Sequence, residues 1–394
     1  MTLENWPDRI RAQLAEVVDE GRWRAPRTFD ARGPVGTLEG ADVVSFASND
    51  YLGLSAHPAV RAASHDALDR WGTGAGASRL VTGSRPVHAE LEEELAQWKG
   101  TEAGVCFPTG FAANLGVLSV LGGPGVRVFS DELNHASIID GCRLSRAEVA
   151  VYRHRDLGHL EDLLASSDTR PKMPSLVVTD AVFSMDGDMA PLDDLMALCA
   201  RHGALLVIDE AHAVLGPRLE LSGVSGTANS TVVRVGTLSK TLGSLGGFVA
   251  ASRDIVDLLI NRARSYIFST ALPPADAAAA LAAVRILRSE EGEALVNRLT
   301  TLVHRMSVAG LAPESHPSPI IPVILGPEHA AIDASSTLLA RGLWVPAIRP
   351  PTVPAGTSRL RVTLSAAHGD DDVTALIDAL HSLPLPESMA AGTR

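Results

Sequence analysis

Short apolar runs alternate with helix-like segments through the middle of this chain, and that alternation is the strongest constraint on its fold. Six runs have the length and composition of buried strands: "GVCF" at 104–107, "RVFS" at 127–130, "VAVYR" at 149–153, "SLVVTD" at 175–180, "ALLVIDE" at 204–210 and "TVVRVGT" at 231–237. Segments such as "HAELEEELAQW" and "PLDDLMALCARHG" alternate with them and have helical periodicity. The pattern predicts an α/β fold with a mostly parallel sheet covered by helices, in which ligands bind at the carboxyl ends of the strands.

The length predicts more than one domain. A chain of 394 residues exceeds one ordinary hydrophobic core. Apolar residues at helical spacing between positions 10 and 18 predict an N-terminal helical segment over 1–45. We expect a large domain over 46–285 and a smaller C-terminal α+β domain over 286–394, which contains the strand-like "PIIPVIL" and "RLRVTLS".

The charge and the cysteines limit the partners and the compartment. A formal net charge of −12 at pH 7 repels phosphate backbones and anionic membrane surfaces, so we expect no nucleic acid and no membrane as a partner. Cys106, Cys142 and Cys199 have no redox or metal-binding spacing. The N-terminal residues lack the apolar core of a signal peptide. These features predict a cytoplasmic protein without a metal site.

One lysine is conspicuous, in "GTLSKTLGSLGG" at 236–247. Only three of the 34 basic residues are lysines: Lys99, Lys172 and Lys240. Lys240 follows an apolar run, so it lies at the expected ligand edge of the sheet. An amine condenses with an aldehyde to a Schiff base and can later act as a base, which guanidinium cannot do. Lys240 is therefore the candidate covalent anchor of a cofactor, with an ordinary surface lysine as the alternative.

An acid and a histidine follow another strand, in "LLVIDEAH". Asp209 at the end of a buried strand needs a cationic partner, such as a protonated pyridine nitrogen or, alternatively, an arginine. His212 lies three residues further along and is expected to reach the same ligand. "DEAH" is also the Mg²⁺-binding motif of helicases, but no lysine of this chain stands in the required phosphate-binding glycine loop. We exclude that alternative.

Further candidates stand where other strands end. "FPTGFAANLG" predicts a strand, a turn and a helix, whose amides at Gly110 and Phe111 suit a phosphate. The hydroxyls of Thr237 and Ser239 are expected to add contacts to it.

Two more side chains are candidate contacts of an aromatic ligand. His135 lies in the polar turn "SDELNHASIIDG" and is a candidate for stacking or hydrogen bonding. Ser184 lies in the turn-rich "VFSMDGDMAPL" and is a candidate hydrogen-bond donor. Each residue type is also common in ordinary turns.

Together these motifs resemble the α-oxoamine synthase family of pyridoxal-phosphate enzymes. The matching blocks run in family order from residue 48 to 368: "SNDYLGLSAHP", "GASRLVTGS", "TGFAANLG", "NHASIIDG", "VFSMDGDMAPL", "IDEAH", "GTLSKTLGSLGG" and "PPTVPAGTSRLRVTLSAAH". The resemblance implies the fold-type I, aspartate-aminotransferase-like architecture and the cofactor pyridoxal 5'-phosphate.

The resemblance also implies roles in holding the cofactor. Lys240 would carry it as a Schiff base, Asp209 would pair with its ring nitrogen, and His135 would stack on the ring. The remaining cofactor contacts would be His212 and Ser184 at the ring oxygen, and Gly110, Phe111 and Thr237 at the phosphate. The family is dimeric with shared sites, so Ser269 and Thr270 would reach the phosphate of a second subunit in a homodimer.

For the substrates, the resemblance implies an amino acid and an acyl-CoA. Arg361, with Asn49 nearby, would hold the amino-acid carboxylate, and Arg24 and Thr352 would contact the acyl-CoA. His135 is also expected to face the substrate.

The segment "IRPPTVPAGTSRLR" resembles the family members that join L-alanine to pimeloyl-CoA or a pimeloyl carrier protein. Glycine C-acetyltransferase, 5-aminolevulinate synthase and serine palmitoyltransferase are the sister activities, and a non-catalytic binding protein is the alternative of another class. Ala77 and Ala213 stand where the family commonly has glycine.

Overall fold

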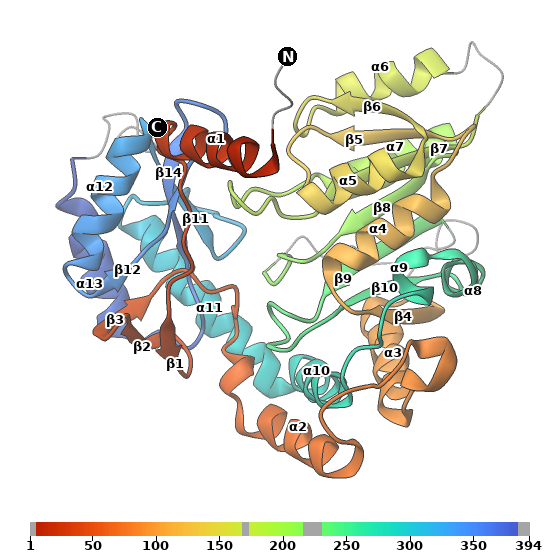
Figure 1. The fold of residues 1–394 in the computed structure, drawn as a ribbon, viewed down its shortest axis with the longest axis horizontal. Coiled ribbons are helices and arrows are strands. Elements are labelled where there is room, and N and C mark those ends of the chain that lie inside the picture. Colours follow the sequence, from red (N-terminus) through yellow and green to blue (C-terminus); the bar gives the residue numbers. More distant parts are fainter. Residues whose placement is uncertain (1–4, 168–172, 216–230, 385–394) are drawn as a thin grey trace.

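A computed structural model describes residues 5–167, 173–215 and 231–384 (Figure 1). Its centre is a seven-stranded sheet in the order β4-β10-β9-β8-β7-β5-β6. The strands are β4 (Ala103–Phe107), β5 (Arg127–Asp131), β6 (Glu148–Tyr152), β7 (Ser175–Asp180), β8 (Leu205–Asp209), β9 (Val232–Thr237) and β10 (Gly247–Ala251). Strands β5 to β9 pair in parallel, and β10 is antiparallel to both of its neighbours. The predicted α/β fold with a mostly parallel sheet is confirmed.

Helices cover both faces of this sheet, because its strands are apolar on both sides. In β7, Leu176 and Val178 pack with the helices of one face, and Val177 between them packs with those of the other. The first face carries α4 (Gly110–Leu121), α5 (Ala136–Ser145), α8 (Arg253–Arg262) and α9 (Arg264–Ile267). The second carries α6 (Leu157–Ser167) and α7 (Leu192–His202).

A second part of the chain packs beside this sheet (Figure 1). It contains the three-stranded sheet β11-β14-β13 and two C-terminal helices that pack with it in one core. Its elements are β11 (Ile320–Gly326), β12 (Leu343–Trp344), β13 (Ala347–Ile348), β14 (Ser358–Thr363), α12 (Glu328–Leu339) and α13 (Asp370–His381). The helices α2 (Pro58–Trp71), α3 (Pro86–Lys99), α10 (Pro274–Leu287) and α11 (Glu290–Val308) share the same core.

The N-terminal segment differs from the prediction of a helical segment over 1–45. The helix α1 (Trp6–Asp19) is present, but β1 (Phe29–Ala31), β2 (Val35–Leu38) and β3 (Ala41–Ser45) follow it. Glu39 and Gly40, between β2 and β3, have φ of +53° and +88°, as a tight hairpin turn requires. Strand β3 pairs in parallel with β12, which joins this segment to the C-terminal part. The boundaries at 45 and 285 stay predictions.

The turn after β9 positions Lys240. The N–H of Gly243 donates to the Lys240 carbonyl over 2.9 Å, and Gly243 has a φ of +59°. A Cβ there would lie 2.3 Å from the backbone nitrogen of Ser55, in the short 3-10 helix Leu54–Ala56. Glycine is therefore required for both the backbone conformation and the close approach.

None of the helices formed by the described residues combines the length and the apolar character that crossing a bilayer requires.

Candidate active site

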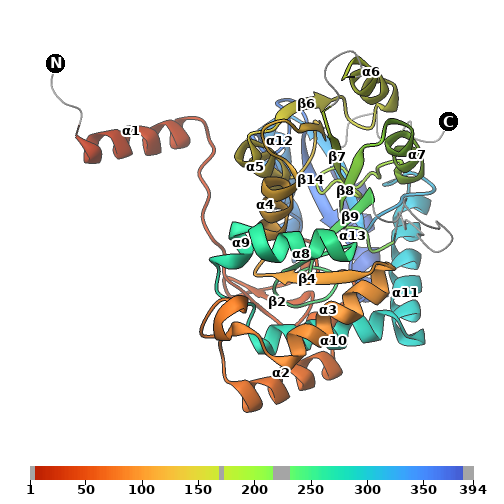
Figure 2. The ribbon, with the colours of Figure 1, turned by 90° about the vertical axis from the view of Figure 1, so that its right-hand side faces the viewer.

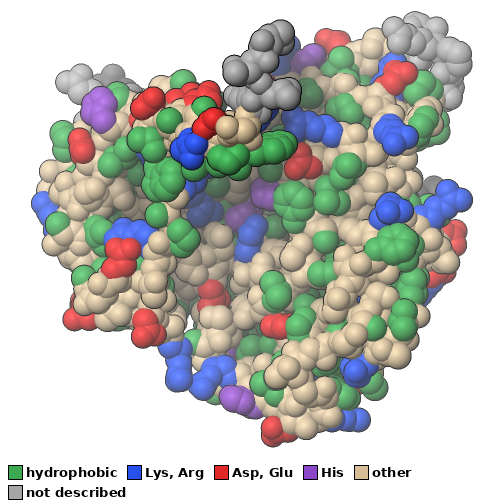
Figure 3. Space-filling view, viewed as in Figure 1, with side chains coloured by type: hydrophobic (Ala, Val, Ile, Leu, Met, Phe, Trp, Pro, Cys, Tyr) green, Lys and Arg blue, Asp and Glu red, His purple; other side chains and the backbone are tan. Residues whose placement is uncertain are grey.

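The candidate site lies at the carboxyl ends of β7, β8 and β9, where the sheet faces the C-terminal part. Asp180 ends β7, Asp209 ends β8, and Lys240 stands in the turn that follows β9. Figure 3 shows a hollow between the two halves of the molecule, with histidine and basic side chains visible inside it. The predicted ligand edge thus carries the predicted residue types.

Lys240 is joined to a chain of hydrogen bonds. Its Nζ lies 2.8 Å from Nε2 of His212, and Nδ1 of His212 lies 2.5 Å from the hydroxyl of Tyr51. Burial lowers the pKa of Lys240; Asp209 and Asp180 oppose this shift, and Arg361 adds to it. A lowered pKa favours the uncharged amine, and this is the form that attacks an aldehyde.

Asp209 is buried, and no lysine or arginine among the described residues forms an ion pair with it. Its carboxylate accepts hydrogen bonds from Nδ2 of Asn114 over 2.6 Å and from the N–H of Ala211 over 2.9 Å. Oδ1 of Asn114 is itself buried and has no hydrogen-bond partner among the residues that the structure describes. The structural alternative weighed from the sequence, a carboxylate paired with arginine, is therefore wrong, and a buried acid without a cation invites a cationic ligand.

Asp180 lies beside Asp209 in the pairing of β7 with β8. Burial and the charge of Asp209 raise the pKa of Asp180 well above its usual value. Its Oδ2 accepts the backbone N–H of His135 over 2.8 Å, and its own N–H donates to Oδ1 of Asn134 over 2.8 Å. These two bonds fix the start of the segment that carries His135.

His135 stands at the N-terminus of α5 as its capping residue. Its Nδ1 lies 2.7 Å from the hydroxyl of Ser137 and accepts the N–H of the same residue over 3.2 Å. The ring centroid of His135 lies 6.3 Å from that of Phe111. The structure thus brings together two residues predicted to contact the cofactor.

A candidate anion-binding site lies where α4 begins. Thr109 caps this helix and accepts the N–H of Ala112 over 3.0 Å, and a Cβ on Gly110 would lie 3.2 Å from Thr237 Cβ. The hydroxyls of Thr237 and Ser239 lie 2.7 Å apart. A helix N-terminus next to two hydroxyls is a favourable place for a phosphate.

Arg361 projects from β14 and is buried. Its Nη2 donates to Oδ1 of Asn49 over 3.1 Å, its Nη1 to the hydroxyl of Thr363 over 2.9 Å, and its Nε to the carbonyl of Ser184 over 2.6 Å. The structure therefore brings Arg361 next to Asn49 and to the backbone of Ser184, and the roles expected of these residues stay predictions.

Arg24 and Thr352 line one pocket, and their predicted contact with the acyl-CoA stays a prediction. Arg22, Ala347, Ile348, Arg349 and Pro350 complete its lining. Three arginines in one pocket favour an anionic ligand. Thr270, in contrast, is exposed between α9 and α10, so its predicted contact across a dimer stays a prediction.

The loop after β7 is held by three ion pairs that the sequence did not reveal, one of them between Arg155 and Asp188 at 3.0 Å. Arg359 pairs with Asp186, and Nε2 of His154 lies 2.8 Å from Asp188. Nδ1 of His154 lies 3.0 Å from Asp131. Although burial lowers it, the two carboxylates raise the pKa of His154 to about 9.

Sequence reasoning missed Tyr51, Asn114 and Asp180 as residues of the site. All three stand within quoted blocks, and Asp180 ends an apolar run as Asp209 does. The position of Asp180 at the end of an apolar run was therefore the signal that could have identified it.

The departures Ala77 and Ala213 are accommodated without strain, because neither has a positive φ.

Comparison with known proteins identifies the class. Residues 41–380 match the aminotransferase class I and II family, and the chain belongs to that family. Among its relatives, an 8-amino-7-oxononanoate synthase of Anaeromyxobacter dehalogenans is 51% identical over 98% of each chain. Another, of Geobacter sulfurreducens, is 46% identical and covers 94% of this chain and 96% of its own.

Solved structures agree with this class. A serine palmitoyltransferase of Sphingomonas wittichii has a TM-score of 0.85 at 32% identity and covers 97% of this chain and 98% of its own. An 8-amino-7-oxononanoate synthase of Francisella tularensis has a TM-score of 0.70 at 28% identity, over 86% and 97%. The predicted family and its architecture, and the prediction of a pyridoxal-phosphate-dependent acyltransferase, are confirmed.

Proposed function

We propose that this chain condenses L-alanine with a pimeloyl thioester, as an 8-amino-7-oxononanoate synthase does, and releases CO₂ and the thiol of the acyl carrier. The product would be 8-amino-7-oxononanoate, an intermediate of biotin biosynthesis, and the carrier CoA or a carrier protein. The observation that carries the proposal is the identity of 46–51% with synthases of this name over nearly the whole chain.

The cofactor is pyridoxal phosphate, and the residues of the site fit it. Lys240 offers an amine with a lowered pKa, and Asp209 is buried and forms no ion pair with a lysine or arginine of the residues that the structure describes. When bound, pyridoxal phosphate supplies an aldehyde for the lysine and an electron-withdrawing ring that stabilises a carbanion at Cα of the amino acid. A protonated ring nitrogen would give Asp209 a cationic partner.

The other residues of the site would hold the cofactor in place. Gly110, Phe111 and Thr237, with Ser239 beside them, would bind the phosphate at the start of α4. His212 and Ser184 would hold the ring oxygen, and His135 would lie against the ring. These roles are supported by the proximity of the residues around the strand ends.

The substrates would be held by arginines. The guanidinium of Arg361 would bind the alanine carboxylate as a bidentate pair, next to Asn49. Arg24 and Thr352 would contact the acyl-CoA in the pocket that they line. Lys240, freed from the cofactor, would remove the Cα proton as the base. His135 is the candidate donor to the keto oxygen.

We further propose a homodimer in the cytoplasm. Helix α1 stands away from the rest of the chain (Figure 2), and none of its residues is buried. Trp6, Ile10, Leu14 and Val18 form an exposed apolar stripe on it, which a second copy would cover. Thr270 would then reach the phosphate of the neighbouring subunit. Light scattering that shows a monomer at micromolar concentration would contradict this.

The test of function supplies the purified protein and pyridoxal phosphate with L-alanine or glycine and a series of acyl-CoAs. We expect release of CoA with alanine and pimeloyl-CoA, and none from Lys240→Ala. Release only with glycine and acetyl-CoA or succinyl-CoA would favour a sister enzyme. No release with any pair would favour a binding protein, against which the presence of Lys240, Asp209 and Arg361 speaks.

A further inference from the structure

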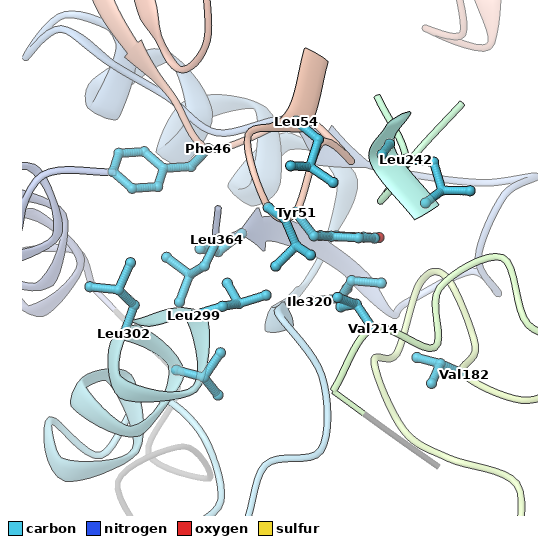
Figure 4. Packing of buried hydrophobic residues seen from close by; sticks show 14 of the residues in the cluster. Phe46, Tyr51, Leu54, Val182, Val214, Leu242, Leu299, Leu302, Ile320 and Leu364 are labelled. Carbon is cyan, nitrogen blue, oxygen red and sulfur yellow. The ribbon is translucent and has the colours of Figure 1, made fainter. Parts of the chain in front are cut away.

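The hydroxyl of Tyr51 contacts two polar residues of the site, and the proposed reaction gives it no role. The ring of Tyr51 packs in the apolar core with Leu54 and Leu242 (Figure 4). Its hydroxyl lies 3.1 Å from Oδ1 of Asn49 and 2.5 Å from Nδ1 of His212. Burial raises the pKa of Tyr51 to about 12, so the hydroxyl keeps its single proton near neutral pH.

Arg361 sets the direction of these hydrogen bonds. A guanidinium only donates, so the atom of Asn49 that lies 3.1 Å from Nη2 of Arg361 is the carbonyl oxygen Oδ1. A carbonyl oxygen only accepts, so Tyr51 donates its proton to this same oxygen. Oδ1 has two lone pairs and accommodates both donors. The proton of Tyr51 is therefore not available to His212.

His212 must then donate to Tyr51. Burial, and the charge of Lys240, lower the pKa of His212 well below its usual value, so its ring is neutral and carries one N–H. The short contact with the Tyr51 hydroxyl is a hydrogen bond only if that N–H is at Nδ1. Nε2 is left with a lone pair, and it lies 2.8 Å from Nζ of Lys240. The lysine is therefore the donor in this last bond.

We propose that Asn49 and Tyr51 are positioning residues that keep the proton of His212 on Nδ1. Nε2 of His212 then accepts an N–H of Lys240, and the lone pair of the amine stays free to attack an aldehyde. With the proton on Nε2 instead, His212 would donate to that lone pair and occupy it. The inference rests on the proposed function, in which Lys240 meets the aldehyde of pyridoxal phosphate.

The environment of Lys240 favours the uncharged amine, which has such a lone pair. Burial lowers the pKa of Lys240, and the charge of Arg361 adds to this shift. Asp209 and Asp180 oppose it. The hydrogen bond to His212 gives the reactive form one orientation, because an N–H points at Nε2 and the lone pair then points elsewhere.

The first test locates the proton of His212 in the cofactor-free protein. ¹⁵N spectra of histidine-labelled protein distinguish a protonated from an unprotonated ring nitrogen, and His212→Asn identifies the signals of this residue among the 13 histidines. We expect a protonated Nδ1 and an unprotonated Nε2 in the wild type. A proton on Nε2 would overturn the proposal, and this result needs no variant that might fail to fold.

A matched pair of variants tests whether Asn49 and Tyr51 fix this proton. Asn49→Leu has a similar size but no acceptor, so the proton of Tyr51 turns to His212. We then expect the Nδ1–H signal of His212 to be lost and an Nε2–H signal to replace it. Asn49→Asp keeps an acceptor oxygen beside Arg361 and should retain the wild-type pattern. The wild-type pattern in a folded Asn49→Leu protein would show that these residues do not position the proton.

The second test follows the attachment of pyridoxal phosphate to Lys240 by absorbance, at an alkaline pH at which the amine is uncharged in every protein compared. The rate should fall about fivefold in Asn49→Leu, because the lone pair must first leave a hydrogen bond, and should stay near the wild-type rate in Asn49→Asp. Equal rates in the wild type and Asn49→Leu would overturn the proposal. Neither test uses alanine or an acyl-CoA, so its failure is distinguishable from a failure of the proposed condensation.

Discussion

Asp180 and Asp209 stand opposite each other at the carboxyl ends of β7 and β8. Both acids are buried, but they accept hydrogen bonds from different partners. Asp209 accepts hydrogen bonds from Asn114 and Ala211. Asp180 accepts the N–H of His135, and burial beside Asp209 raises its pKa well above the usual value. A carboxyl group that is buried beside a second acid resists ionisation.

The first prediction follows from the raised pKa of Asp180. Asp180→Asn keeps a neutral acceptor for the N–H of His135, so the free energy of unfolding in urea should hardly change. Asp180→Ala leaves that buried N–H without its partner and should cost about 1–3 kcal/mol. If the asparagine variant loses as much stability as the alanine variant, Asp180 is not neutral in the folded protein.

The second prediction concerns alkaline pH and His154. Its pKa is raised to about 9 in the folded protein by Asp131 and Asp188, with burial opposing, against about 6.5 in an unfolded chain. The stability that it contributes is therefore complete below about pH 6.5 and is lost as the pH rises through about 9. With some of the ring still open to solvent, at most about 3 kcal/mol is at stake.

Urea unfolding between pH 6 and 10 checks this. The wild-type protein should lose stability over that interval relative to His154→Gln. His304→Gln, at an exposed position on α11, is the control and should follow the wild type. If the free energies of unfolding of the wild type and of His154→Gln changed with pH in parallel, the ion pairs of His154 would not stabilise the fold.

The third prediction concerns the turn that carries Lys240. Gly243→Ala adds a Cβ 2.3 Å from the backbone of Ser55, so the turn must move, and we expect a loss of stability greater than about 2 kcal/mol together with weaker binding of pyridoxal phosphate. Gly100→Ala is the matched control, because Gly100 has a similar φ of +66° with open space around it. It should cost only about 1 kcal/mol. Equal losses in the two variants would show that the contact with Ser55 is unimportant.

The fourth prediction concerns the carboxylate of alanine. Arg361→Lys keeps a positive charge but loses the planar fork that binds a carboxylate through two hydrogen bonds. Steady-state kinetics should show KM for L-alanine raised by about tenfold or more, the effect of about 1.4 kcal/mol, with KM for pimeloyl-CoA little changed. A rise confined to pimeloyl-CoA would assign Arg361 to the other substrate.

The sheet was predictable because its strands are continuous apolar runs, and β4 to β9 begin and end close to the expected residues. Strand β10 was missed, since "GFVAA" is short and continues a glycine-rich turn. Strands β1 to β3 were missed because they are only three to five residues long and contain no run of consecutive buried apolar residues.

The site was predictable only in part, for a physical reason. Lys240, Asp209 and His212 follow strand ends, so the topology of a parallel sheet brings them together. Arg361 and Asn49 are 312 positions apart in the chain, and no local pattern links such residues. Their roles were expected from the resemblance to a family. The position of Tyr51, whose hydroxyl contacts both Asn49 and His212, emerged only from the packed structure.

The most direct test of the central claim follows the carboxyl carbon of alanine. The protein, with pyridoxal phosphate, receives L-alanine labelled with ¹³C at C1 and pimeloyl-CoA, and mass spectrometry follows every product. We predict ¹³CO₂ and free CoA in equal amounts and unlabelled 8-amino-7-oxononanoate. Labelled pyruvate without CoA release would instead show transamination and would contradict the proposed reaction.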